Sequence, residues 1–159
     1  MESTPGIVIA IVGAESTGKS TLAHTLAQRI ADEARLTCAP VDEHLRTWCE
    51  SMGRTPRIDE QRGIAQTQHE RIAQAGSTHD VVVADTTAAM IAVYSRYVFG
   101  DRSLDAWAAG LHARSVAHTL VTALDLPWVA DGLQREGEHV RAPIDAMLRE
   151  LLATHHIGW

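Results

Sequence analysis

The chain has 159 residues, of which 45% are hydrophobic and 21% charged, and its formal net charge is −6. This length favours one globular domain over residues 1–159, with enough apolar surface for a core. The acidic balance argues against a protein that binds nucleic acid directly, since such proteins usually carry a basic face. No basic region precedes the short apolar run at residues 7–12. Neither a signal peptide nor a membrane contact is therefore expected, and the predicted location is the cytoplasm.

The first apolar run, Ile7–Val12, predicts a strand, and the residues that follow it fit the phosphate-binding P-loop pattern G-x-x-x-x-G-K-[ST]. These residues are Gly13, Ala14, Glu15, Ser16, Thr17, Gly18, Lys19 and Ser20. The glycines let backbone N–H groups turn inward at a helix N-terminus, which forms an anion site. We expect Lys19 to reach the β- and γ-phosphates of ATP, the Ser20 hydroxyl to bind Mg²⁺, and Thr21 to add a phosphate contact.

Strand-like and helix-like segments alternate after the P-loop, which predicts an α/β fold of the P-loop NTPase class, with a parallel sheet flanked by helices. Further strands are expected at Arg35–Val41 apart from Pro40, at Val81–Ala84 and at Leu120–Ala123. Apolar periodicity predicts helices at about 18–32, 45–52, 58–76, 90–98 and 104–115, and a last helix with Pro143 in its first turn. A fifth strand is not seen, so we expect a sheet that lacks or truncates its last strand.

Two carboxylates, Asp42 and Glu43, follow the second strand. In small P-loop kinases the acceptor hydroxyl lies near this strand end, where a carboxylate can accept its proton. Glu43 is the first candidate and Asp42 the second, while Arg46 could bind phosphate or pair with a carboxylate. The alternative is a negatively charged helix start that the helix dipole favours, and the sequence leaves both interpretations open.

Asp85 ends the third strand, in the position where P-loop proteins hold Mg²⁺ with an aspartate. A helix N-cap is the alternative role for this residue. The next residues are Thr86 and Thr87. AAA-type motor ATPases normally have a glutamate here to activate water, so its absence favours phosphoryl transfer over hydrolysis.

The stretch 125–141 is rich in charges and glycine and is predicted to form a loop, with a lid at about 128–141. Arg135 and Arg141 are the candidates for stabilising the charge that develops on the transferred phosphoryl group. A solvated charged loop is the alternative. Cys38 and Cys49 have no metal-binding spacing and are expected to be free thiols.

Together these motifs resemble the nicotinamide riboside kinase domain of the bifunctional bacterial NAD-biosynthesis regulator, over about residues 7–155. The matching features are the P-loop segment 13–22, Glu43-x-x-Arg46, the glutamine-rich helix with Gln66, Gln68 and Glu70, Asp85-Thr86, Tyr94, Phe99-Gly100, and Pro127-Trp128-Val129-Ala130-Asp131-Gly132. Where the family usually has a second aspartate the chain has Thr87, and Gln134 precedes the lid arginine Arg135. The resemblance implies ATP-dependent phosphorylation of a ribosyl 5′-hydroxyl.

Two functions follow from these features. The first is a small-molecule kinase that transfers the γ-phosphate of ATP to a nucleoside such as nicotinamide riboside, with Lys19, Glu43, Arg135 and Arg141 as catalytic candidates. The second is a regulatory, AAA-like ATP-binding module that hydrolyses ATP slowly without a small-molecule acceptor. The sequence does not fix the oligomeric state, and an oligomer is compatible with it.

Overall fold

The computed structural model describes residues 4–130 and 137–159. In chain order its elements are β1 Ile7–Val12, α1 Lys19–Ala34, β2 Cys38–Val41, α2 His44–Met52, the 3-10 turn η1 Ile58–Glu60, α3 Gln61–Gly76, β3 Val81–Asp85, α4 Ala88–Phe99, α5 Asp105–Ser115, β4 His118–Val121, the 3-10 turn η2 Glu138–Val140 and α6 Arg141–Thr154.

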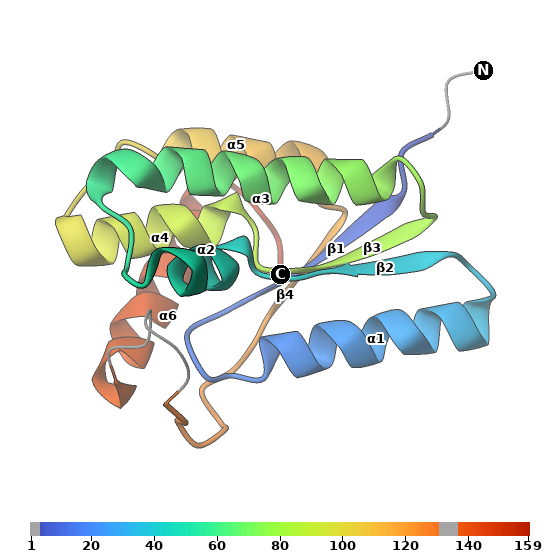
Figure 1. Ribbon diagram of the computed structural model, residues 1–159, viewed down its shortest axis with the longest axis horizontal. Helices are drawn as coiled ribbons and strands as arrows, with labels where there is room; N and C mark the ends of the chain where they lie inside the picture. Colours follow the sequence, from blue (N-terminus) through green and yellow to red (C-terminus); the bar gives the residue numbers. More distant parts are fainter. Residues whose placement is uncertain (1–3, 131–136) are drawn as a thin grey trace.

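The described strands form one parallel sheet in the order β2-β3-β1-β4, flanked by helices, which confirms the predicted fold class. Ala10 pairs with Ala84 of β3 and with Thr119 of β4, so β1 lies inside the sheet. Helix α1 covers one face, and α3 and α5 lie on the other (Figure 1). Because all four strands are parallel, their carboxyl ends meet at one edge, where α/β proteins bind ligands.

Side-chain alternation along the central strands explains the two layers. Ile11 and Val83 pack with Ala23 and Ala27 of α1. On the opposite face, Val82 belongs to a cluster with residues of β1, β2 and α3. Both faces are therefore covered, which accounts for the continuous β-branched run of β3.

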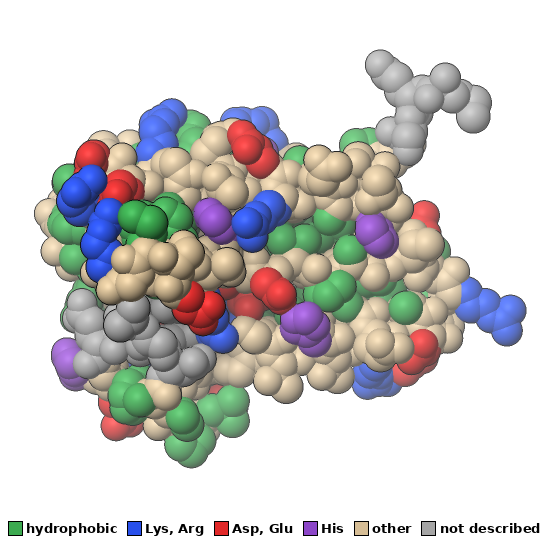
Figure 2. All heavy atoms as spheres, viewed as in Figure 1, with side chains coloured by type: hydrophobic (Ala, Val, Ile, Leu, Met, Phe, Trp, Pro, Cys, Tyr) green, Lys and Arg blue, Asp and Glu red, His purple; other side chains and the backbone are tan. Residues whose placement is uncertain are grey.

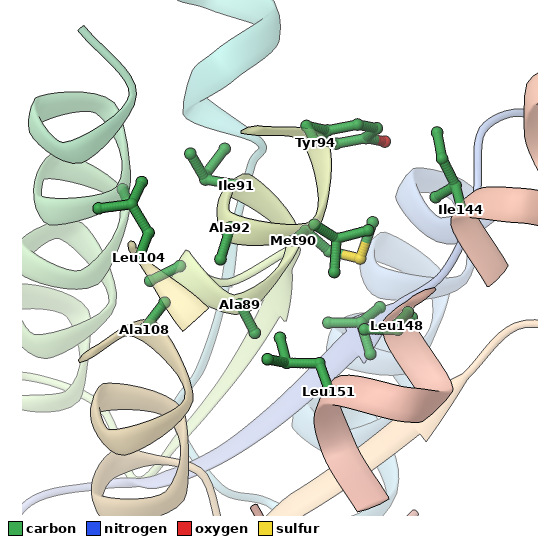
Figure 3. Packing of buried hydrophobic residues seen from close by; sticks show 14 of the residues in the cluster. Ala89, Met90, Ile91, Ala92, Tyr94, Leu104, Ala108, Ile144, Leu148 and Leu151 are labelled. Atoms are coloured by element: carbon green, nitrogen blue, oxygen red, sulfur yellow. The ribbon is translucent and has the colours of Figure 1, made fainter. Parts of the chain in front are cut away.

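Helix α4 is the centre of the largest core cluster, because its residues from Ala88 to Ser95 are all buried. Figure 3 shows Met90 of α4 close to Leu148 of α6, and Ala89 between Leu151 of α6 and Ala108 of α5. Such all-round burial requires an apolar helix without a polar face. The packing of α6 against α4 holds the C-terminal helix beside the carboxyl edge of the sheet.

The structure corrects three boundaries. Strand β2 begins at Cys38 rather than at Arg35, and it includes Pro40. A proline is compatible with this strand because, among the described strands, β2 pairs only with β3 and its other edge needs no N–H donor. The fourth strand begins earlier than predicted, at His118, and ends at Val121. The C-terminal end of the predicted lid is helical, since η2 and the start of α6 occupy it.

Within residues 4–130 and 137–159 the sheet has four strands and no fifth. No helix in these ranges is long and apolar enough to cross a membrane. Both cysteines are free thiols, as predicted.

Candidate functional site

The P-loop connects β1 to α1 and borders a cavity of about 440 Å³. The cavity is lined by Ser16, Thr17, Gly18, Lys19, Ser20, Thr21, Glu43, Arg46, Leu126, Pro127 and Val129. Gly18 has a φ of 80°, which favours glycine. At Gly13 a Cβ would lie 1.9 Å from the Thr122 hydroxyl oxygen, so the first glycine permits close approach of the chain after β4.

Polar contacts inside the loop hold its conformation. The Thr17 hydroxyl donates to the carbonyl of Ala14 at 2.8 Å and lies 2.6 Å from the Thr122 hydroxyl. Lys19 is the only lysine of the sequence, is 5% exposed, and donates from Nζ to the same Ala14 carbonyl at 2.7 Å. The predicted phosphate lysine therefore lies at the start of α1, with its ammonium group bonded to the loop, beside the cavity that it lines.

Ser20 and Asp85 come together from different elements. The Ser20 hydroxyl donates to Asp85 Oδ2 at 2.5 Å. Asp85 Oδ1 is buried and has no hydrogen-bond partner among the described residues. The N-cap of α4 is Thr87, so the alternative role of Asp85 as helix cap is wrong. A hydroxyl and a carboxylate oxygen at this point fit a Mg²⁺ site, because Mg²⁺ takes few protein ligands and fills the rest with water and phosphate.

A second cavity of about 270 Å³ adjoins the first. Its lining residues are Ser20, His24, Asp42, Glu43, Arg46, Thr47 and Asp85. Charged and histidine side chains gather on this face between α1 and α2 (Figure 2). The carboxylates at the ends of β2 and β3 therefore line the same cavity. Their positions at the carboxyl ends of parallel strands predict this.

The two carboxylates after β2 differ in environment. Glu43 is 5% exposed and lines both cavities. It occupies the N-cap position of α2 but makes no side-chain capping bond, and its Oε2 lies 4.0 Å from Arg46 Nε. Asp42 is exposed and lies 2.7 Å from His24 Nε2. Burial beside both cavities favours Glu43 over Asp42 as a functional carboxylate.

The segment after β4 contacts the P-loop. The Ser16 hydroxyl donates to the carbonyl of Val129 at 3.1 Å and accepts from its N–H at 2.8 Å.

Arg135 lies outside the described residues. Arg141 is the first residue of α6 and is 5% exposed. Its Nε and Nη2 are buried without hydrogen-bond partners among the described residues, and it is not one of the residues that line the first cavity. Arg141 is therefore part of a buried helix start rather than a solvated loop.

Sequence reasoning missed a buried histidine near the site. His112 of α5 lies between the hydroxyls of Thr87 and Thr119, at 2.8 Å from each, and burial lowers its pKa to about 4. Thr87 is therefore one of the two partners of His112. The resemblance expects an aspartate at the position of Thr87. The position of a histidine on a helix does not indicate these partners in the sequence, because they come from the start of α4 and from β4.

Comparison with protein families matches residues 8–159 to the AAA domain family. The chain therefore belongs to the AAA domain family. A comparison with curated proteins found no match.

Solved structures of P-loop kinases share the fold. NadR in complex with NAD and AMP-PNP superposes with a TM-score of 0.75 at 21% identity, over 96% of this chain and 42% of that one. NadR in complex with NR gives 0.76 at 21% identity with the same coverage. Thymidylate kinase from Ehrlichia chaffeensis gives 0.61 at 12% identity, over 96% of this chain and 84% of that one. The chain spans less than half of the NadR chains. The resemblance to the kinase domain of the NAD-biosynthesis regulator is confirmed at the level of fold.

Proposed function

We propose that the chain is an ATP-dependent phosphotransferase that transfers the γ-phosphate to the 5′-hydroxyl of a small nucleoside. One observation carries the proposal: the buried carboxylate of Glu43 lines both the P-loop cavity and the adjoining cavity that Ser20 and Asp85 share. A donor phosphate in the first cavity and an acceptor hydroxyl in the second would both lie beside this carboxylate. Phosphoryl transfer needs this kind of positioning more than covalent chemistry.

Each residue has a defined task in this proposal. The P-loop N–H groups and Lys19 bind the phosphates, and Ser20 with Asp85 holds Mg²⁺. The ion, when bound, neutralises charge on the phosphate oxygens. Glu43 accepts the proton of the acceptor hydroxyl. Arg135 and Arg141 are proposed to stabilise the transferred group. For Arg141 the support is its buried guanidinium, since such a group favours an anionic partner.

A third cavity supports a ring-bearing acceptor. Its volume is about 380 Å³. The lining is largely apolar and consists of Leu45, Thr55, Pro56, Arg57, Ile58, Gln61, Tyr94, Val98 and Phe99. Gln61 is 4% exposed, and its Oε1 has no hydrogen-bond partner among the described residues. An aromatic base with an N–H donor matches this lining. Nicotinamide riboside is our first candidate, because a structural neighbour was solved in complex with NR.

A slow regulatory ATPase is the second candidate, because the chain belongs to the AAA domain family. Thr86 and Thr87 stand after Asp85, where motor ATPases carry a water-activating glutamate, and this favours transfer. A coupled ADP-release assay over a panel of nucleosides, with and without acceptor, separates the two. ADP that appears only with an acceptor supports the kinase. ADP at the same rate without any acceptor would overturn it, and the Lys19→Ala variant controls for contaminating activity.

A further inference from the structure

One buried amide connects the two carboxylate-bearing strand ends. Gln68 of α3 is 1% exposed. Its Oε1 accepts from the backbone N–H of His44 at 2.7 Å, and its Nε2 donates to the backbone carbonyl of Thr86 at 3.0 Å. The two partners fix the orientation of the amide, because the oxygen must face the N–H group and the NH₂ group must face the carbonyl.

The two backbone partners are the neighbours of the proposed functional carboxylates. His44 begins α2 and directly follows Glu43. Thr86 directly follows Asp85 at the end of β3. The side chain of Gln68 thus spans the gap between the strand end that carries Glu43 and the strand end that carries Asp85.

The backbone at Thr86 needs such support. Thr86 has a φ of 76°, a left-handed conformation that is unfavourable for a β-branched residue. Its N–H group donates to the carbonyl of Ile11 at 2.9 Å, and its own carbonyl accepts from Gln68. Residues in such conformations persist only where surrounding contacts over-determine them. The hydrogen bond from Gln68 is therefore one of the contacts that hold this turn.

We propose that Gln68 is a positioning residue that keeps Glu43 and Asp85 in one fixed arrangement. The proposal rests on the phosphotransferase function proposed above. The two hydrogen bonds of Gln68 in the described structure both go to backbone groups, so it acts through the two residues beside its partners. Without the amide, α2 and the turn after β3 keep their separate packing but lose their direct connection.

Two substitutions with one control test the proposal. Gln68→Met keeps the length of the side chain and removes both hydrogen bonds. Gln68→Glu keeps an acceptor oxygen for the N–H group of His44. When the new carboxyl group is ionised, its second oxygen faces the Thr86 carbonyl, and two acceptors then oppose each other. The protonated acid has one O–H donor and one acceptor and so reproduces the amide. The control is Gln66→Met on the same helix, where the wild-type side chain only donates to Glu70 at the surface.

The first readout is steady-state turnover with the acceptor that the nucleoside panel identifies. We expect Gln68→Met to lower kcat at least tenfold while ATP affinity in the absence of Mg²⁺, measured by calorimetry, changes less than twofold. We expect Gln68→Glu to show the same loss at pH 8 and to recover towards wild type as the pH falls to 6. Dividing the variant's kcat by that of wild type at each pH cancels the groups that the two proteins share, so the ratio isolates the new carboxyl group. The Gln66→Met control should match wild type.

The second readout does not need an acceptor. Calorimetric ATP titrations with and without Mg²⁺ give the factor by which Mg²⁺ strengthens ATP binding. We expect Gln68→Met to reduce this factor at least fivefold, because Asp85 loses its position. Wild-type protein that turns over no acceptor would end the phosphotransferase proposal, while the Mg²⁺ factor would still decide the role of Gln68. A folded Gln68→Met variant with wild-type kcat and Mg²⁺ factor would overturn the inference. So would a loss in Gln68→Glu that does not change with pH.

Discussion

His112 predicts a specific loss of stability at acid pH. The side chain is 2% exposed and lies between the hydroxyls of Thr87 and Thr119. Both hydroxyls could accept from a protonated ring, so protonation need not break either contact. The cost is that of placing a positive charge in the interior, and burial lowers the pKa of His112 from 6.5 to about 4 for this reason.

The direction of the effect follows from proton binding in the two states. The unfolded chain takes up a proton at the ordinary pKa of 6.5, and the folded protein does so only near pH 4. Between these values the unfolded state binds more protons, so the free energy of unfolding falls as the pH falls. The contribution is complete above pH 6.5 and is lost by about pH 4. At about 1.4 kcal/mol for each pH unit, the loss is on the order of 3 kcal/mol.

Urea unfolding at pH 7.5 and pH 4.5 measures this loss in wild type and in His112→Gln, which keeps a polar side chain without a titrating ring. We expect wild type to lose about 2–3 kcal/mol more stability between the two pH values than the variant does. The exposed His118 provides the matched control, and His118→Gln should behave as wild type. Equal losses in wild type and His112→Gln would refute the reasoning, since the remaining pH dependence would then come from other groups.

Three further predictions concern the site. Lys19→Ala should abolish tight ATP binding in calorimetry while the circular dichroism spectrum stays native, because Lys19 contacts the loop rather than the core; unchanged affinity would remove the phosphate role of the P-loop. Asp85→Asn should raise the Mg²⁺ concentration needed for half-maximal activity about tenfold or abolish activity, since it keeps the shape and loses the charge; a normal Mg²⁺ titration would count against the metal role. Glu43→Gln should lower kcat by about 10²–10⁴ with ATP affinity nearly intact, as expected for loss of a general base. Glu50→Gln, on the exposed side of the same helix, is the control, and a loss of less than threefold in Glu43→Gln would leave Glu43 as a helix-start charge only.

The sequence predicted the features that depend on local pattern. The P-loop, the third strand with Asp85 at its end, and the helix that precedes this strand are all visible in residue spacing and match the structure. The sequence pattern predicts the start of β4 two residues late, because its first residues, His118 and Thr119, are polar. Thr119 points to His112, a partner that no periodicity reveals.

Other features depend on tertiary packing and could not be predicted. Pro40 fits a strand only because β2 is at the edge of the sheet, and edge position is a property of strand order. The contacts of Gln68 with His44 and Thr86 join three elements, whereas the helical pattern indicates only that Gln68 faces inward. The left-handed backbone of Thr86 goes against its local preference, so only the folded environment explains it.

The place of β1 inside the sheet also sets when the phosphate-binding loop can form during synthesis. β1 is made first but pairs with β3 and β4, and its nearest strand in sequence, β2, pairs only with β3. Ile7 can therefore form its backbone pairing in the sheet only after Val81 has been synthesised. A nascent chain that ends before residue 81 carries the complete P-loop sequence without the strand that supports it. During that interval the β-branched run of β1 lacks its partner strand in the sheet, and unpaired strands of this kind are prone to association with other chains.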